Sequence, residues 1–215
     1  QVATIGEVDW NHLEPGDTVR IFHRAEPYRE KILVRGKGTE TQPIRVCGVP
    51  SATGELPHVT GESATTRPDL DYGDLSNLME DLAVLAIYHR SYEQRPENIV
   101  VEGLKLSGTL GDPGTPAAVL SYTATNGTVR KYRSAAACLR IQEGKNVTIR
   151  GNELTGCGNG LFVLSRIPES QMTRNILIEG NVLHGNGVVG EEGIHNAYVQ
   201  GVDITLQLNV FGPNR

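Results

Sequence analysis

Several features that mark common protein classes are scarce in this sequence. Aromatic residues make up 5% of its 215 residues, against 25 glycines, which favours tight turns over a thick aromatic core. No apolar run approaches the roughly 20 residues that a membrane-spanning helix needs, so a membrane is not expected as a partner. The net charge of −5 provides no general basic face, so nucleic acid is not expected either, and any site for an acidic ligand must be locally basic.

The N-terminus and the common catalytic motifs are equally uninformative. The opening QVATIGEVDW has neither a basic start nor an apolar signal core, so a signal peptide has either been removed or never existed. The sequence contains no phosphate-binding glycine loop with lysine, no GxSxG and no HExxH. It also has no Asp-Asp pair, which ranks a two-carboxylate hydrolase below a lyase.

The three cysteines, Cys47, Cys138 and Cys157, are odd in number and match no zinc motif. Each is flanked by apolar or glycine residues. We therefore expect small buried side chains rather than a disulfide framework or a nucleophile.

The second half of the chain contains an internal repeat. Each of four nine-residue segments begins with Asn or Asp and carries apolar residues at its second and fourth positions, which predicts a strand. Glycine or asparagine then predicts a sharp bend. The segments are 98-NIVVEGLKL-106, 146-NVTIRGNEL-154, 175-NILIEGNVL-183 and 203-DITLQLNVF-211.

The repeat predicts an all-β fold. A second short strand precedes each segment, the period is just under 30 residues in the last three repeats, and no amphipathic helix lies between strands. These features exclude propellers, leucine-rich repeats and βαβ units, and they predict a single-stranded parallel β-helix. Aliphatic residues should stack inward and bend asparagines should bond from coil to coil. The aliphatic residues are Val101, Ile149, Ile178 and Leu206, and the asparagines are Asn152, Asn181 and Asn209.

We expect one β-helix domain over residues 1–215. It comprises N-terminal coils (1–64), an acidic surface excursion (65–81) and regular coils (82–215) interrupted by an insertion (107–134). The last segment enters a new coil with full apolar alternation and stops at Arg215. Such an incomplete or open C-terminal end implies missing coils or a stacking partner.

The first half of the chain carries a resemblance to a known family. Its runs of turns and strands are 13-LEPGDTVRIF-22, 28-YREKILVRGKGTETQPIRVCGVP-50 and 54-GELPHVTGESA-64. They resemble the opening coils of secreted right-handed parallel β-helix repeat proteins, the superfamily of pectate-lyase-like and chondroitinase-B-like polysaccharide lyases. The resemblance implies a right-handed helix in a secreted or periplasmic bacterial protein that acts on carbohydrate. It also implies that Lys or Arg removes the proton alpha to a uronate carboxylate, with calcium as an optional cofactor; no other cofactor and no metal ligand is predicted.

One group of candidate site residues lies in the loop and strand 185–199. His195 and Tyr198 are candidate catalytic acids or bases, and Tyr198 could equally stack on a sugar. Glu191, Glu192 and Asn196 are candidate substrate-binding residues, with either glutamate able to orient the imidazole. A core histidine and an ordinary strand aromatic remain the structural alternatives.

Basic residues form a second group of candidates. Lys105, Arg140 and Arg166 occur on or beside strands of successive coils, where stacking would align them. A row of this kind recognises carboxylates or sulfates, with Arg166 as a candidate catalytic base and the other two as binding residues. A solvated charged face is the alternative.

Two functions therefore remain open. The first is a polysaccharide lyase-like enzyme that cleaves an acidic, uronic-acid-containing polysaccharide by β-elimination. The second is a non-catalytic β-helix that binds or adheres to glycans, or that assembles through its open end.

Overall fold

The computed structural model describes residues 4–73, 79–111, 119–165, 168–188 and 190–214, and within them the chain is all-β with parallel sheets. We name the three parallel sheets the front, long and short sheets. The front sheet contains β2 (Ile32–Val34), β5 (Ala83–Ile87), β10 (Ala137–Gln142), β13 (Asn159–Leu164) and β16 (Ala197–Val199). The long sheet contains β1 (Thr18–Phe22), β3 (Ile44–Val49), β6 (Glu97–Glu102), β11 (Lys145–Arg150), β14 (Arg174–Glu179) and β17 (Val202–Gln207). The short sheet contains β4 (His58–Thr60), β7 (Lys105–Ser107), β12 (Glu153–Thr155), β15 (Val182–His184) and β18 (Val210–Phe211).

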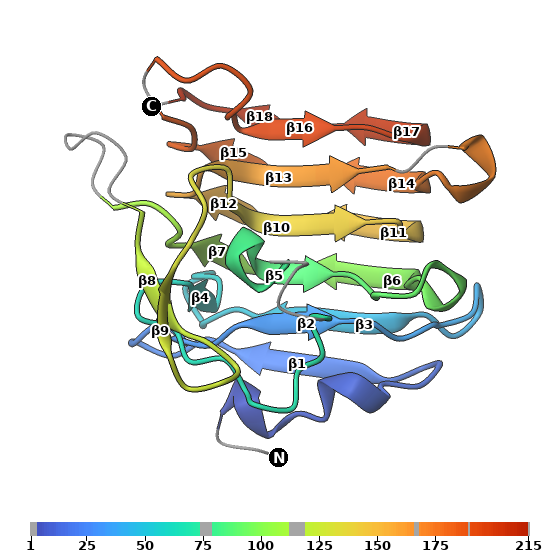
Figure 1. Cartoon of the computed structure of the whole chain (residues 1–215), viewed down its shortest axis with the longest axis horizontal. Helices are drawn as coiled ribbons and strands as arrows, with labels where there is room; N and C mark the ends of the chain where they lie inside the picture. Colours follow the sequence, from blue (N-terminus) through green and yellow to red (C-terminus); the bar gives the residue numbers. More distant parts are fainter. Residues whose placement is uncertain (1–3, 74–78, 112–118, 166–167, 189, 215) are drawn as a thin grey trace.

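The chain passes through these sheets in a fixed order, front, long and short, and we call one such passage a tier. Figure 1 shows the tiers stacked from β2–β4 up to β16–β18. Each strand pairs in parallel with its counterpart in the next tier. The repeat predicted these pairings correctly: Ile149 is in register with Val101 below and Ile178 above, and Ile178 is in register with Leu206.

A positive φ explains why each repeat begins with Asn or Asp. Asn98, Asn146, Asn175 and Asp203 have φ of 54°, 53°, 55° and 55°. This left-handed region is costly for most residues and tolerated by Asn and Asp, whose side chains can hydrogen-bond locally. The amides also link the tiers: Nδ2 of Asn146 donates to Oδ1 of Asn98 (3.0 Å), and Nδ2 of Asn175 donates to Oδ1 of Asn146 (2.7 Å).

A second asparagine stack lies inside the bend between the long and short sheets, as the sequence predicted. Asn152 and Asn181 are each 1% exposed. Oδ1 of Asn181 accepts two hydrogen bonds from Asn152, one from its backbone N–H and one from its Nδ2, both at 3.0 Å. Nδ2 of Asn181 donates to the carbonyl of Ile149 (2.9 Å) and to Oδ1 of Asn209 (3.0 Å). One side chain therefore satisfies two backbone groups of the tier below it, at a bend that would leave them without partners.

The prediction of three unbridged cysteines is wrong. Cys138 and Cys157 form a disulfide across a Cα–Cα distance of 5.6 Å, whereas Cys47 is free. The two half-cystines are 19 residues apart in sequence, and the turn from one tier into the next brings them together. The odd number of cysteines argued against a disulfide framework, and one bridged pair was therefore missed.

Two segments cover the outer face of the lower front sheet. The first contains the 3₁₀ turn η3 (Met79–Leu82), and the second contains the antiparallel hairpin of β8 (Ser121–Thr123) and β9 (Val129–Lys131). Tyr122 and Tyr132 of this hairpin form a small apolar cluster outside the main core. Four short 3₁₀ turns complete the described elements: η1 (Ile5–Glu7), η2 (Trp10–His12), η4 (Tyr92–Gln94) and η5 (Glu169–Gln171).

The last tier exposes apolar side chains. Leu206 is 45% exposed, Leu208 81%, Val210 58% and Phe211 51%. Among the described residues, no helix has both the length and the apolar character needed to span a membrane.

Removal of a buried asparagine from the stack should destabilise the fold. We expect Asn181→Ala to lower the free energy of unfolding by about 2–3 kcal/mol, because it removes the side-chain partner of the buried Asn152 N–H and of the Ile149 carbonyl in the tier below. Asn175→Gly is the matched control: Asn175 is exposed and glycine keeps its positive φ, so its loss should stay below about 1 kcal/mol. Urea unfolding followed by circular dichroism measures both, and equal losses would contradict the role of the buried stack.

The disulfide can be tested by counting thiols. In denaturant without reductant we expect one reactive thiol, that of Cys47, and three after reduction. Replacing both half-cystines with alanine should cost about 3 kcal/mol of stability, because the bridge closes a loop with a sequence separation of 19. Three reactive thiols before reduction would show that the bridge does not form.

Candidate functional site

Three outward-facing residues of the front sheet lie in one row across successive tiers. Arg140 on β10 is in register with Phe162 on β13, and Phe162 is in register with Tyr198 on β16. Their neighbours along each strand, such as Leu139 and Leu161, face inward and are fully buried. The alternation of strands therefore places this row on the outer face of the sheet.

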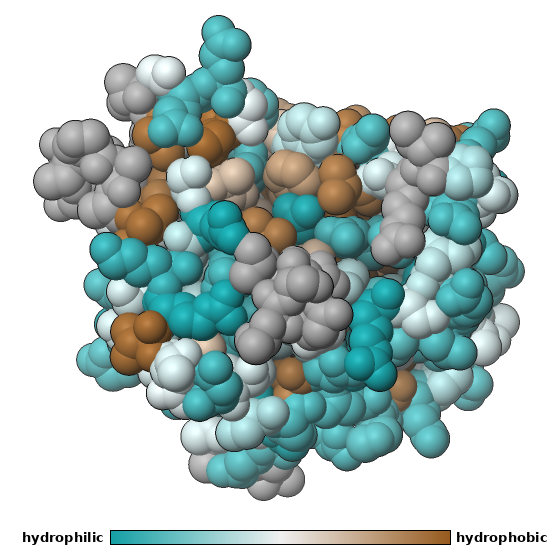
Figure 2. All heavy atoms as spheres, viewed as in Figure 1, coloured by the Kyte–Doolittle hydropathy of each residue, from teal (hydrophilic) through white to brown (hydrophobic). Residues whose placement is uncertain are grey.

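The row forms a continuous stack, which we call the platform. The rings of Phe162 and Tyr198 are 4.7 Å apart between centroids, with an interplanar angle of 11°. The guanidinium carbon of Arg140 lies 4.3 Å from the centroid of Phe162. Exposure increases along the stack, from 6% for Arg140 to 37% for Tyr198. Figure 2 shows apolar groups gathered over the upper strands of this face, between polar ones.

Arg140 is the cationic end of the platform. Its Nη2 donates to Oε1 of Gln142 (3.2 Å), and its Nε is buried without a hydrogen-bond partner. Burial lowers the pKa of Arg140 to about 10, which still leaves the guanidinium charged at neutral pH. Within the described part of the chain no carboxylate forms an ion pair with it, so the platform carries an uncompensated positive charge.

The structure separates most of the predicted site residues from this row. His195 is half-buried and Glu191 and Glu192 are exposed. No ion pair or hydrogen bond joins either carboxylate to the imidazole in the part of the chain that is described, so the expected orientation of His195 by glutamate is absent. Arg166 lies outside the described residues.

Asn196 is placed as a structural residue rather than a ligand for substrate. It is 6% exposed and belongs to a third asparagine stack. Its Oδ1 accepts from Nδ2 of Asn186 (3.0 Å), and its own Nδ2 donates to the carbonyl of Gly212 (2.8 Å). The amide is therefore occupied within the fold. Asn196 lies in the bend that precedes β16 and not on the strand that carries Tyr198.

Lys105 lies on a different face, in a polar row of the short sheet. Its Nζ donates to Oε1 of Glu153 (2.9 Å), which Nε2 of His184 also approaches (3.1 Å). Burial alone would raise the pKa of Glu153, but the hydrogen bonds from Lys105 and His184 hold it below its usual range. On the same face, Nε2 of His58 lies 2.7 Å from Oγ of Ser107. This row links neighbouring strands and contributes nothing to the platform.

A basic pocket of about 370 Å³ lies where β2 and β5 end, and the sequence analysis missed it. Its charged lining is cationic, provided by Arg35 and Lys37, with two histidines beside them. The full lining is Asn11, His12, Arg35, Gly36, Lys37, His89 and Gln94. These residues come from four segments that no local motif connects.

A buried lysine also lies on the outer face of the front sheet, under the two covering segments. Lys31 is 2% exposed, and its Nζ lies 3.8 Å from the ring centroid of Tyr122, 4.6 Å from that of Tyr132 and 5.8 Å from that of Tyr72. The Nζ donates to the carbonyl of Glu80. Burial lowers the pKa of Lys31 to about 7, against the opposing effect of the Glu80 carboxylate.

Comparison with known proteins gives distant structural similarity only. No protein-family model and no curated protein matches the chain. A GH136 lacto-N-biosidase from Eubacterium ramulus is similar in its native form, with 12% identity and a TM-score of 0.42 over 95% of this chain and 36% of that one. Its selenomethionine form gives 14% identity and a TM-score of 0.43 over 96% and 37%. The chain thus spans about a third of the length of these structures, and at this distance the likeness says nothing about activity.

The resemblance to pectate-lyase-like and chondroitinase-B-like polysaccharide lyases is wrong. The similar solved structures are of a GH136 lacto-N-biosidase, and no pectate-lyase-like protein is among them. The motifs behind the resemblance are turn and ladder residues. Any stack of parallel strands needs such residues, whatever its activity, so they did not distinguish this superfamily from others.

The buried lysine makes stability depend on pH in a defined direction. Between about pH 7 and pH 10.5 the unfolded chain carries the Lys31 proton and the folded chain does not, so folding becomes more favourable as pH rises. The slope is at most about 1.4 kcal/mol per pH unit. Relative to Lys31→Met, which lacks the titration, the wild type should gain stability between pH 7 and pH 9.5. Parallel stability curves for the two proteins in urea would contradict the lowered pKa.

Proposed function

We propose that this chain is a carbohydrate-binding protein whose ligand lies along the outer face of the front sheet. In this proposal the three sheets are the faces of a single-stranded, right-handed parallel β-helix, and the tiers are its coils. The order of strands through the sheets supports the helix. The platform of Arg140, Phe162 and Tyr198 is the single observation that carries the binding function.

Arg140 and Tyr198 cover the two faces of Phe162, so the ring face that suits the flat face of a sugar is the outer face of Tyr198 at the end of the stack. The C–H face of a pyranose packs against an aromatic ring, and a rigid aromatic side chain contributes contact area at little entropic cost. Tyr198 is exposed, and its stacking on Phe162 fixes the orientation of its ring. A fixed and exposed ring on a regular sheet is a prepared surface rather than one that must order on binding.

The charged end of the platform favours an acidic polysaccharide. A guanidinium without a carboxylate partner attracts anionic groups, and its planar donors match a carboxylate or sulfate. Arg140 supplies this charge at one end of the row, in a chain whose net charge is −5. The expected ligand is therefore a uronic-acid-containing or sulfated chain rather than a neutral one.

The proposal is one of binding and includes no β-elimination, because that reaction depended on the resemblance that the comparisons overturned. A secreted or periplasmic location is part of the proposal. The Cys138–Cys157 bridge supports it, because disulfides persist mainly in oxidising compartments.

Removal of the exposed ring should weaken binding. We expect Tyr198→Ala to reduce the affinity for a galacturonate oligosaccharide about tenfold, the equivalent of about 1.4 kcal/mol, with a similar loss for Phe162→Ala. Isothermal titration calorimetry measures both, with the methyl-esterified, uncharged oligosaccharide as the ligand control.

Phe22→Ala is the matched protein control, because Phe22 is 49% exposed but lies on β1 of the long sheet. It should bind as the wild type does. Equal affinities for Tyr198→Ala and the wild type, or a loss confined to Phe22→Ala, would contradict the platform as the binding surface.

A further inference from the structure

The basic pocket is the second place on this molecule that is prepared for a ligand. Asn11 and His12 come from η2, Arg35 and Lys37 follow β2, His89 follows β5, and Gln94 ends η4. A volume of about 370 Å³ falls within the range of small-molecule sites, roughly 300–1,000 Å³. No carboxylate is among its lining residues.

Arg35 is held in place by partners on both sides. Its Nη1 lies 3.1 Å from Oδ2 of Asp71, and its Nη2 lies 2.7 Å from Nε2 of His89. Because the guanidinium can only donate, Nε2 of His89 accepts and the imidazole is neutral in this arrangement. Burial, together with the nearby Arg35, lowers the pKa of His89, consistent with a neutral ring. The ring therefore fixes the guanidinium without adding or removing charge.

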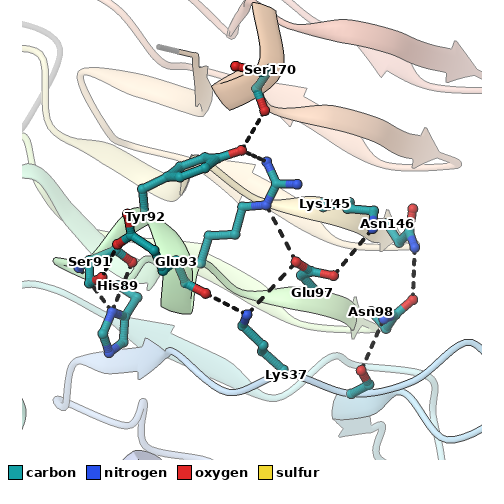
Figure 3. A network of polar contacts seen from close by, with 12 residues as sticks. Lys37, His89, Ser91, Tyr92, Glu93, Glu97, Asn98, Lys145, Asn146 and Ser170 are labelled. Atoms are coloured by element: carbon teal, nitrogen blue, oxygen red, sulfur yellow. Dashed lines mark hydrogen bonds and ion pairs between the residues drawn. The ribbon is translucent and has the colours of Figure 1, made fainter.

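Lys37 supplies the second charge and remains accessible. Its Nζ donates to the carbonyl of Glu93 (2.7 Å) and lies 4.0 Å from Oε1 of Glu97, while its side chain is 40% exposed. Figure 3 shows Lys37 held between these two residues, with His89 nearby. An ammonium has three donors, so Lys37 retains donor capacity for an incoming anion.

Cations exceed carboxylates in the surrounding shell. Asp71 is shared by Arg35 and Arg90, and Glu97 is shared by three cations, at 3.4–4.0 Å. The three that share Glu97 are Lys37, Arg95 and Lys145. Two further carboxylates lie nearby without lining the pocket: Asp9 hydrogen-bonds His12, and Glu93 accepts from the hydroxyl of Ser91. Within the described residues, the five cations Arg35, Lys37, Arg90, Arg95 and Lys145 thus face four carboxylates beside the pocket, and two of those four carry all five ion pairs.

The pocket and the platform lie on the same side of the molecule. Leu33, two residues before Arg35, is in register with Ala86, and Ala86 is in register with Arg140. Arg140 is therefore two tiers above β2, about 10 Å up the sheet at roughly 4.8 Å per strand. Leu33 and Ala86 lie buried beneath the segments that cover the lower front sheet, so an extended ligand that reaches both the pocket and the platform must cross the outside of those segments.

The geometry points to a subsite in this pocket for the anionic group of a sugar, a carboxylate or a sulfate ester, belonging to the polysaccharide that lies along the front sheet. The inference rests on the proposed function and adds the place where acidic sugars are distinguished from neutral ones. The platform supplies stacking, and Arg35 and Lys37 supply the two cations that hold the charged group.

The test uses probes too small to need the platform. Sodium galacturonate and inorganic sulfate are titrated separately into the ¹⁵N-labelled protein, and amide shifts are followed by NMR. We expect galacturonate, sulfate or both to shift Gly36, Lys37, His89 and Gln94, and the probe that binds more tightly identifies the anion. Lys37→Gln should weaken that binding at least fivefold and Lys37→Arg should retain it. Lys131→Gln is the control, because it makes the same charge change on β9.

The outcomes separate this inference from the proposed function. The absence of shifts at these residues with both probes overturns the subsite, as does equal weakening by Lys37→Gln and Lys131→Gln. The subsite is also overturned if the affinity for the oligosaccharide falls in Tyr198→Ala but not in Lys37→Gln. That result would still support the platform as a binding surface. If Lys37→Gln weakens the binding of galacturonate while Tyr198→Ala leaves the affinity for the oligosaccharide unchanged, the subsite is supported. The proposal that the platform binds the glycan is then contradicted.

Discussion

The fold depends on hydrogen bonds that asparagine side chains make between tiers at the bends. A strand satisfies its backbone through its neighbours, but a bend does not, and a buried amide or carbonyl left without a partner costs about 1–3 kcal/mol. Asn152, Asn181 and Asn209 supply the missing partners at one bend, and Asn98, Asn146 and Asn175 link another. Asn186 and Asn196 do the same where the chain returns to the front sheet. These stacks keep every tier in one register.

The register in turn creates the candidate binding surface. Because tiers repeat without a slip, outward residues at one position of β10, β13 and β16 lie directly above one another. An arginine, a phenylalanine and a tyrosine at that position become a stack of a cation and two rings. A slip of one residue in any of these strands would turn one member inward and break the platform. The same register places Arg35 below the platform on the same side of the molecule. The basic pocket therefore lies on the side that carries the platform.

The sequence predicted the repeating part of this structure and missed most of what departs from the repeat. Period-2 alternation located the long-sheet strands and their register, because the inward aliphatic residues are the repeat itself. The disulfide was missed because Cys138 and Cys157 meet only through the geometry of a turn. Phe162 was missed because its run, 161-LFVLS-165, reads as an ordinary apolar strand. The basic pocket could not be found from local motifs, because four separate segments build it. The charge of Arg140 and the aromatic ring of Tyr198 made both residues candidates from the sequence. Phe162 lies between them in the structure and joins them into one stack.

The central claim is that the outer face of the front sheet binds an acidic glycan, and mapping of the bound ligand tests it most directly. A galacturonate oligosaccharide would be added to the ¹⁵N,¹³C-labelled protein, and intermolecular nuclear Overhauser effects would be measured to assigned side chains. Our account predicts contacts from sugar protons to the rings of Phe162 and Tyr198, and none to the aromatic ring of Phe22 on the long sheet. Contacts confined to the long or short sheet, with none to those two rings, would contradict it.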